Sequence, residues 1–102
     1  MYVITESTAL AVLNQLQPSD KERVNRAIER LATNWDAIAP SHVQKMERLV
    51  SSDGKPLFSY RAFKDFRVFL YKNENEIRVV DVIRRSQLES LRSLPGARRE
   101  GI

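Results

Sequence analysis

The chain has 102 residues and a formal net charge of +4, and it contains no cysteine. This length suits one domain with one hydrophobic core, so residues 1–102 are predicted to form a single domain. The lack of cysteine excludes a disulfide framework, thiolate catalysis and a cysteine zinc site.

The positive charge is unevenly distributed along the chain. Residues 1–51 balance six Lys/Arg with six Asp/Glu, whereas residues 52–102 hold eleven against seven. A localised positive charge favours a polyanionic partner, either nucleic acid or an acidic protein. The first residues lack a basic segment followed by an apolar run, and no stretch of about 18 apolar residues occurs. We therefore expect a cytoplasmic protein.

The start of the chain predicts one short strand and two helices. Residues 2–5 are largely β-branched or aromatic, as in a strand. Residues 8–16 carry leucines at helical spacing, and Pro18 disfavours helical geometry in the residue before it. Ser19 and Glu22 form a predicted capping box for a second helix that extends to about Ala32. Its core-facing stripe comprises Val24, Ala27, Ile28 and Leu31.

The middle of the chain is harder to assign. Residues 34–40 predict a loop whose two large apolar side chains, Trp35 and Ile38, pack onto the core. A short helix is predicted over residues 41–49, because three apolar side chains recur there at helical spacing. These are Val43, Met46 and Leu49. Residues 51–56, with the sequence SSDGKP, predict a turn.

Three successive strands are predicted in the second half, at residues 57–63, 66–72 and 77–83. They are rich in aromatic and β-branched side chains, and short polar turns separate them. No glycine or proline interrupts them, so they can pair along their length as an antiparallel meander. A capping box of Ser86 and Glu89 starts a short final helix, and residues 95–102 are expected to be a flexible tail.

The meander has two distinct faces, because side chains alternate along a strand. The predicted core face carries Phe58, Tyr60, Val68, Leu70, Val80 and Val82. The other face gathers Arg61, Arg67, Arg85, Tyr71 and Asp81. Each guanidinium offers a planar fork of donors that matches phosphate, so three arginines on one face indicate an anion site. The alternative is an ordinary solvated face whose arginines pair with nearby carboxylates.

The order of these elements and four sequence segments resemble the RelE/ParE superfamily of bacterial toxins from toxin–antitoxin pairs. The resemblance covers roughly residues 1–94. Its segments are LQPSDKERV at residues 16–24, KMERL at 45–49, SYRAFKDFRVFLY at 59–71 and VVDVIRR at 79–85. It implies a small α+β fold in which a helical hairpin packs on one face of the antiparallel meander and a short helix ends the chain.

For the RelE-like branch, the resemblance implies an endoribonuclease that cleaves mRNA on the ribosome without a metal or other cofactor. The substrate's own 2′-hydroxyl attacks the adjacent phosphate. Three arginines match the expected phosphate-directed groups, namely Arg61, Arg67 and Arg85. Lys55, Lys64, Tyr71 and Arg84 are the further RNA-binding candidates. The resemblance also implies a cognate antitoxin protein as partner.

The chain departs from the ribonuclease pattern at several positions. Lysines of RelE-like members fall on Leu57 and Ser59 here, and a tyrosine position holds Glu89. Arginine cannot act as a general base. The base must come from Lys64, Asp81, Glu89, Tyr71 or Lys55, whereas His42, the only histidine, is interpreted as a surface residue. Two alternatives therefore stay open: a ParE-like protein that inhibits DNA gyrase by binding, and a non-catalytic remnant that docks an antitoxin.

Overall fold

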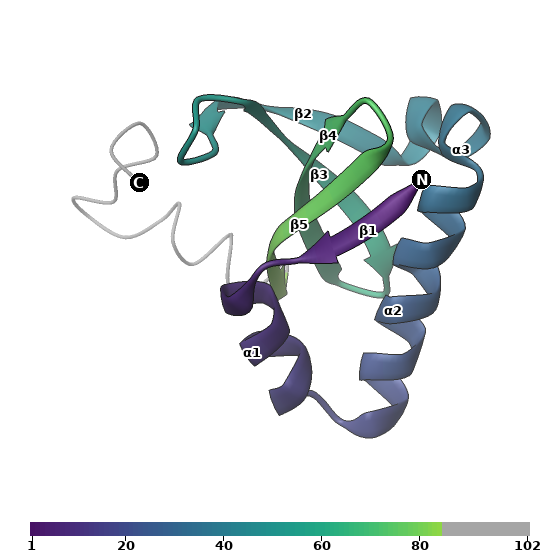
Figure 1. The fold of residues 1–102 in the computed structure, drawn as a ribbon. Helices are drawn as coiled ribbons and strands as arrows, with labels where there is room; N and C mark the ends of the chain where they lie inside the picture. The colour runs from purple at the N-terminus through teal and green to yellow at the C-terminus, as the bar shows by residue number, and fades with distance from the viewer. Residues whose placement is uncertain (85–102) are drawn as a thin grey trace.

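The computed structural model describes residues 1–84, apart from the side chain of Arg48. The predicted capping box of Ser86 and Glu89, the final helix and the tail lie outside the described residues. The described elements are β1 (Tyr2–Thr5), α1 (Ser7–Gln15), α2 (Pro18–Thr33), α3 (Trp35–His42), β2 (Val43–Val50), β3 (Pro56–Phe63), β4 (Phe66–Asn73) and β5 (Glu76–Arg84). They form a small α+β fold (Figure 1).

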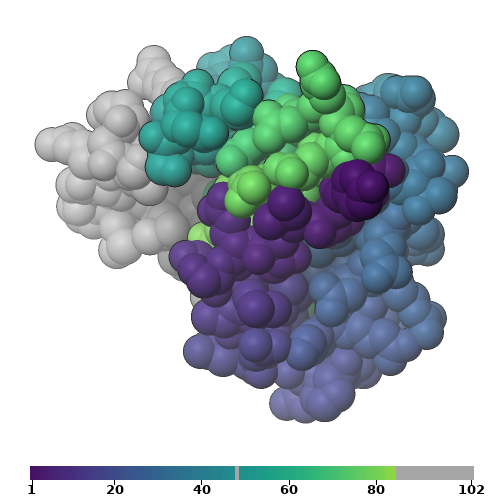
Figure 2. All heavy atoms as spheres, in the orientation of Figure 1, coloured from purple at the N-terminus to yellow at the C-terminus, as the bar shows by residue number. Residues whose placement is uncertain are grey.

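Five strands form one sheet in the order β1-β5-β4-β3-β2. The predicted meander is confirmed as β3, β4 and β5. At most of the strand ends, the observed bound differs from the predicted one by one residue. β1 joins the sheet parallel to β5, so the first strand of the chain pairs with the last described one. Figure 2 shows these two strands side by side on the surface, where the Tyr2 side chain of the edge strand is 72% exposed.

The core lies between the helices and one face of the sheet. The α2 stripe predicted from the sequence is buried in a single cluster with residues of α1 and of β3, β4 and β5. The Tyr60 hydroxyl donates a 3.0 Å hydrogen bond to the carbonyl oxygen of Ala27, and this bond ties β3 to α2. Of the predicted core face, Tyr60, Val68, Leu70 and Val82 are buried, and Phe58 packs against the cluster from its rim.

The prediction that Val80 belongs to the core is wrong. The register between β4 and β5 shifts after the pair of Phe69 and Asp81, so that Leu70 pairs with Val79 rather than with Val80. This β-bulge adds a residue to β5 and reverses the alternation of side chains beyond it. Val79 is therefore fully buried, whereas Val80 is only half-buried.

The helix predicted over residues 41–49 is also wrong, because this segment is strand β2. Val43, Gln44 and Lys45 pair with Tyr60, Ser59 and Phe58 of β3. A free edge of β3 offers backbone hydrogen bonds that outweigh the weak local helical pattern, as tertiary context commonly does. The turn predicted over residues 51–56 is confirmed, with Gly54 at a φ of +83°.

The segment predicted as a loop before β2 is the helix α3. The carbonyl oxygen of Asn34 accepts hydrogen bonds from the backbone amides of Ala37 and Ile38, which closes the first turn. Pro40 lies in its last turn. As predicted, Trp35 and Ile38 pack against the core.

α2 begins earlier than predicted and without the capping box of Ser19 and Glu22. Gln17 is the N-cap residue, its side chain makes no capping hydrogen bond, and Pro18 occupies the first turn. Proline suits this place, because its fixed φ is helical and it has no amide hydrogen to satisfy. Glu22 instead forms an ion pair with Arg26, one turn further along the helix. In the described part of the chain no helix is long and apolar enough to cross a membrane.

Candidate functional site: an arginine pair on the sheet

Arg61 of β3 and Arg67 of β4 are direct cross-strand partners. The residues next to them, Tyr60 and Val68, are also partners and point into the core. Because side chains alternate, the two arginines lie on the opposite face of the sheet. We call this the arginine face; it carries Ser59, Arg61, Arg67 and Phe69. Directly opposed residues of an antiparallel pair have Cβ atoms about 5 Å apart, so the structure brings these two predicted site residues together.

The arginine pair concentrates positive charge. Like charges directly opposite each other destabilise a sheet, and arginine cannot relieve this by losing its proton. Arg61 is exposed and forms no ion pair with any residue between 1 and 84. Arg67 is half-buried. Two guanidinium groups in this arrangement can hold the non-bridging oxygens of one phosphate or of adjacent phosphates.

Asp81 of β5 supplies a carboxylate on the same face. It pairs with Phe69, which is two residues from Arg67 along β4, so Asp81 and Arg67 are diagonal neighbours. One carboxylate oxygen accepts a 2.8 Å hydrogen bond from the backbone amide of Val82. Burial raises the pKa of the Asp81 carboxyl above its usual value, and this hydrogen bond only partly opposes the shift. A carboxylate of raised pKa is a better proton acceptor near neutral pH.

His42 lies nearer the arginine pair than the sequence suggested. It directly precedes Val43, the partner of Tyr60, so its backbone reaches the end of β3 that carries Arg61. Its Nδ1 is 3.3 Å from the carbonyl oxygen of Ile38. A carbonyl can only accept, so Nδ1 must carry the hydrogen in this contact, and Nε2 of the neutral ring then has the free lone pair. Sequence reasoning missed this proximity because it predicted a helix where β2 forms.

The remaining predicted site residues are spread over the molecule. Lys55 is exposed in the turn between β2 and β3, and Lys64 is exposed in the turn between β3 and β4. Arg84 pairs with the buried Phe66 and therefore lies toward the helix-covered side of the sheet, with its guanidinium carbon 4.7 Å from the centre of the Phe66 ring. Arg85 lies outside the described residues.

Tyr71 is 6% exposed, and its predicted role in RNA binding stays a prediction. Its backbone pairs with Arg78 of β5. Burial, and next the Asp53 carboxylate, raise the pKa of the Tyr71 phenol above its usual value. The phenol is therefore a proton donor or a neutral hydrogen-bonding group at physiological pH rather than a base.

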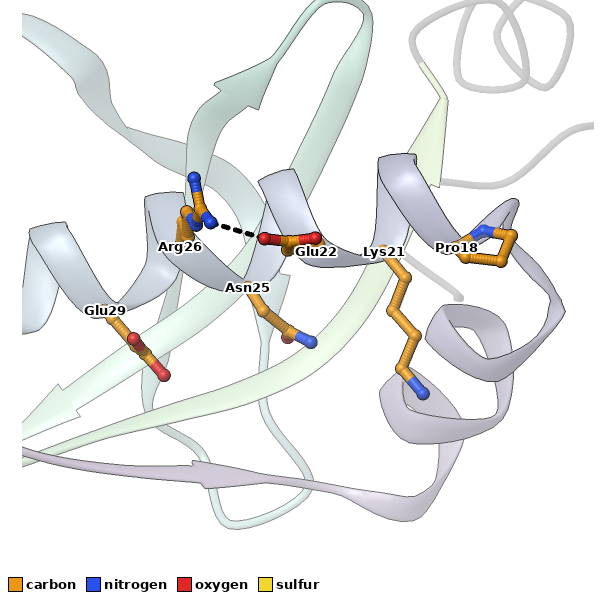
Figure 3. Close-up of a pocket in the computed structure, with 6 residues that line it drawn as sticks. All are labelled: Pro18, Lys21, Glu22, Asn25, Arg26 and Glu29. Carbon is orange, nitrogen blue, oxygen red and sulfur yellow. Dashed lines mark hydrogen bonds and ion pairs between the residues drawn. The ribbon is translucent and has the colours of Figure 1, made fainter.

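A shallow hollow of about 430 Å³ runs along the exposed side of α2 (Figure 3). Its lining contains none of the predicted site residues. Three of its four charged groups are already partnered, because Arg26 pairs with Glu22 and the Lys21 ammonium donates a 2.8 Å hydrogen bond to the Asn14 side chain. In residues 1–84, no three His, Asp or Glu side chains gather as metal ligands. The arginine face is therefore the candidate site.

Comparison with known proteins supports the fold alone. No family model matches the chain, and no curated protein is similar to it in sequence. A solved structure, the archaeal RelE–RelB complex from Pyrococcus horikoshii OT3, contains a chain with the same architecture at a TM-score of 0.63. The match covers 84% of this chain and 96% of that chain, at 18% sequence identity. The predicted RelE-like fold is confirmed.

Proposed function

We propose that this protein is the toxin of a toxin–antitoxin pair and that it cleaves mRNA in the cytoplasm. The observation that carries the proposal is the cross-strand pair of Arg61 and Arg67 on the sheet face away from the helices of a RelE-like fold. Two fixed guanidinium groups suit a substrate whose phosphate gains negative charge as it reacts. The excess positive charge of the second half of the chain suits an RNA substrate as well.

In the proposed reaction, the 2′-hydroxyl oxygen forms a bond to the adjacent phosphorus, and the bond to the 5′-oxygen of the next nucleotide breaks. The products are a 2′,3′-cyclic phosphate and a 5′-hydroxyl end. Negative charge builds on the non-bridging oxygens in the transition state, where Arg61 and Arg67 donate hydrogen bonds to them. The resemblance adds Arg85 as a third such group.

The 2′-hydroxyl must lose a proton, and the leaving oxygen must gain one. Asp81 and His42 are the candidates for these transfers. Asp81 shares the arginine face and has a raised pKa, whereas the Nε2 atom of His42 has a lone pair when Nδ1 donates to Ile38. The reaction conserves protons overall, so one group that accepts and a second that donates are sufficient.

We further propose a cognate antitoxin and the ribosome as partners. The solved structure of similar fold is a RelE–RelB complex. An acidic antitoxin segment laid over the arginine face would neutralise Arg61 and cover the site at once.

Induced expression of the wild type and of Arg61→Gln, with growth and transcript ends followed together, tests the proposal. We expect growth arrest and new mRNA 5′ ends in the wild type, both lost in Arg61→Gln. Arg26→Gln is the matched control, because it removes the same charge from α2 at an arginine already paired with Glu22. Cleavage that persists in Arg61→Gln would refute the arginine site.

Gyrase inhibition by binding is the second candidate function. The observation that favours it is that Leu57 and Ser59 occupy the positions where the resemblance expects lysines, and Leu57 is only 8% exposed. Growth arrest without new mRNA ends, together with loss of gyrase activity in a purified assay, would select this function over RNA cleavage.

A further inference from the structure

Two cations converge on a single aromatic ring at the end of the sheet. The guanidinium carbon of Arg23 and the ammonium nitrogen of Lys64 each lie 5.2 Å from the centre of the Phe63 ring. They reach it from different elements, α2 and the turn between β3 and β4; Figure 1 shows the end of β3 beside α2. Phe63 pairs with Phe66, whose ring carries Arg84. We call Arg23, Phe63 and Lys64 the Phe63 cluster.

The charges of the Phe63 cluster are not neutralised within the described chain. Arg23 and Lys64 are both exposed, and neither forms an ion pair with any of residues 1–84. The negative face of an aromatic ring attracts a cation, but it cannot cancel two charges. An anion bound beside either of these cations would lower the free energy of that cation.

The backbone of Lys64 adopts a turn conformation. Its φ is +50°, in the left-handed region where glycine is favoured and an L side chain is strained. Lys64 and Asp65 form the two-residue turn between β3 and β4, and turns of this length require a positive φ. This turn places the Lys64 ammonium over the Phe63 ring.

The Phe63 cluster follows the arginine pair along β3 but lies on the helix-covered face of the sheet, because the register between β3 and β4 shifts after Arg61 and Phe63 pairs with the buried Phe66. Phe63 follows Arg61 by two residues in β3, a rise of roughly 7 Å. A chain of phosphates held by Arg61 and Arg67 can therefore continue around the sheet end to Arg23 and Lys64. Because cations already lie over the Phe63 ring, a base cannot readily stack there, and the cluster binds phosphate rather than bases.

We propose that the Phe63 cluster is a second phosphate-binding site, which holds the RNA backbone beside the cleaved bond without regard to sequence. This inference rests on the proposed function, since it extends the same substrate beyond the arginine pair. It adds Arg23 of α2, a residue that the sequence did not single out, to the RNA-binding surface.

Binding of 2′-O-methyl RNA tests the proposal, because this RNA lacks the attacking hydroxyl and stays intact. The probes are a trinucleotide, which spans the arginine pair alone, and a long single-stranded oligomer. Arg23→Gln and Lys64→Gly each remove one cation, and glycine also relieves the strained φ of Lys64, so the fold should survive. Thermal unfolding checks that it does.

For the long oligomer we expect each variant to weaken binding by about five- to tenfold at low salt. The slope of log affinity against log salt should fall by about 0.7 for each phosphate that the variant no longer neutralises. Trinucleotide binding should be unchanged. The control Arg26→Gln, which removes an ion-paired arginine from the same helix, should change neither affinity by more than about twofold.

The outcomes separate this inference from the proposed function. If the wild type binds the oligomer and Arg23→Gln matches Arg26→Gln, the second site is refuted while RNA binding stands. If the wild type binds no RNA, the proposed function fails first and this inference fails with it. If the two variants bind RNA as the wild type does but bind a polyglutamate peptide more weakly, the cluster binds an acidic protein and the inference is overturned.

Discussion

Replacing Arg61 with glutamine should stabilise the protein and remove its activity at the same time. Arg61 faces Arg67 directly across β3 and β4. Like charges in this position destabilise a sheet by roughly 0.2–1 kcal/mol, so we expect Arg61→Gln to raise the free energy of unfolding by that amount. Glutamine keeps much of the length of the side chain, and Arg61 is exposed, so the packing should change little.

The same change should slow RNA cleavage strongly. Removing one donor that stabilises transition-state charge costs about 10²–10³ in rate, or roughly 3–4 kcal/mol. The two effects have opposite signs because the pair is unfavourable in the free protein and favourable around a phosphate.

Urea unfolding at low and high salt, combined with single-turnover cleavage, measures both effects. The stability gain should shrink at high salt, because the repulsion is screened within about 10 Å at 0.1 M. In a double-mutant cycle, the double variant of Arg61→Gln and Arg67→Gln should gain less free energy of unfolding than the two single variants gain together. A variant that is less stable than the wild type, or that cleaves normally, would refute the argument that Arg61 is held there for function.

Two further predictions concern the sheet. Leu70→Ala, at a fully buried position of the core cluster, should lower the free energy of unfolding measured in urea by about 2–5 kcal/mol. Val80→Ala at the bulge should lower it by less than half as much. Equal losses would mean that the bulge does not decide which side chains of β5 face the core. Asp81→Asn should raise stability near pH 7, because burial raises the pKa of Asp81 and the folded chain then binds more protons than the unfolded chain between the usual and the raised pKa. Stability of the wild type should therefore fall as pH rises through this window, and the gain in the variant should vanish below about pH 3; a variant that is less stable than the wild type at pH 7 would contradict this.

The local sequence pattern correctly predicted the elements whose residues favour only one kind of secondary structure. The meander was correct because aromatic and β-branched runs without glycine or proline favour strands, and polar turns bound them. The stripe of α2 was correct because its buried residues recur at helical spacing from Val24 to Ala32, over about two and a half turns. In both cases the local preference and the final packing agree.

Long-range pairing fixed what the local pattern could not. The spacing of Val43, Met46 and Leu49 fits a helix, and only the free edge of β3 makes the segment a strand. The position of Val80 depended on a bulge defined by two strands together.

The same distinction applies to the candidate site. Arg61 and Arg67 were placed together correctly because each face follows from alternation along a strand. Arg23 and His42 were not recognised, because they reach the sheet end from helices. Arg23 is exposed on α2, and only the packing of α2 against β3 brings its guanidinium to the Phe63 ring.

The pairing of β1 with β5 also sets when the sheet can be completed during synthesis of the chain. Tyr2 meets Glu76, so the first strand has no partner until most of the chain has been made. Contacts of such high sequence separation are costly to close and slow to form. A nascent chain cannot complete this sheet early, whereas the local hairpin of β3 and β4 can pair as soon as both strands have been made. The order of strands thus leaves the edge of β5 open until β1 can return to it, so the sheet is completed only after β5 has been made.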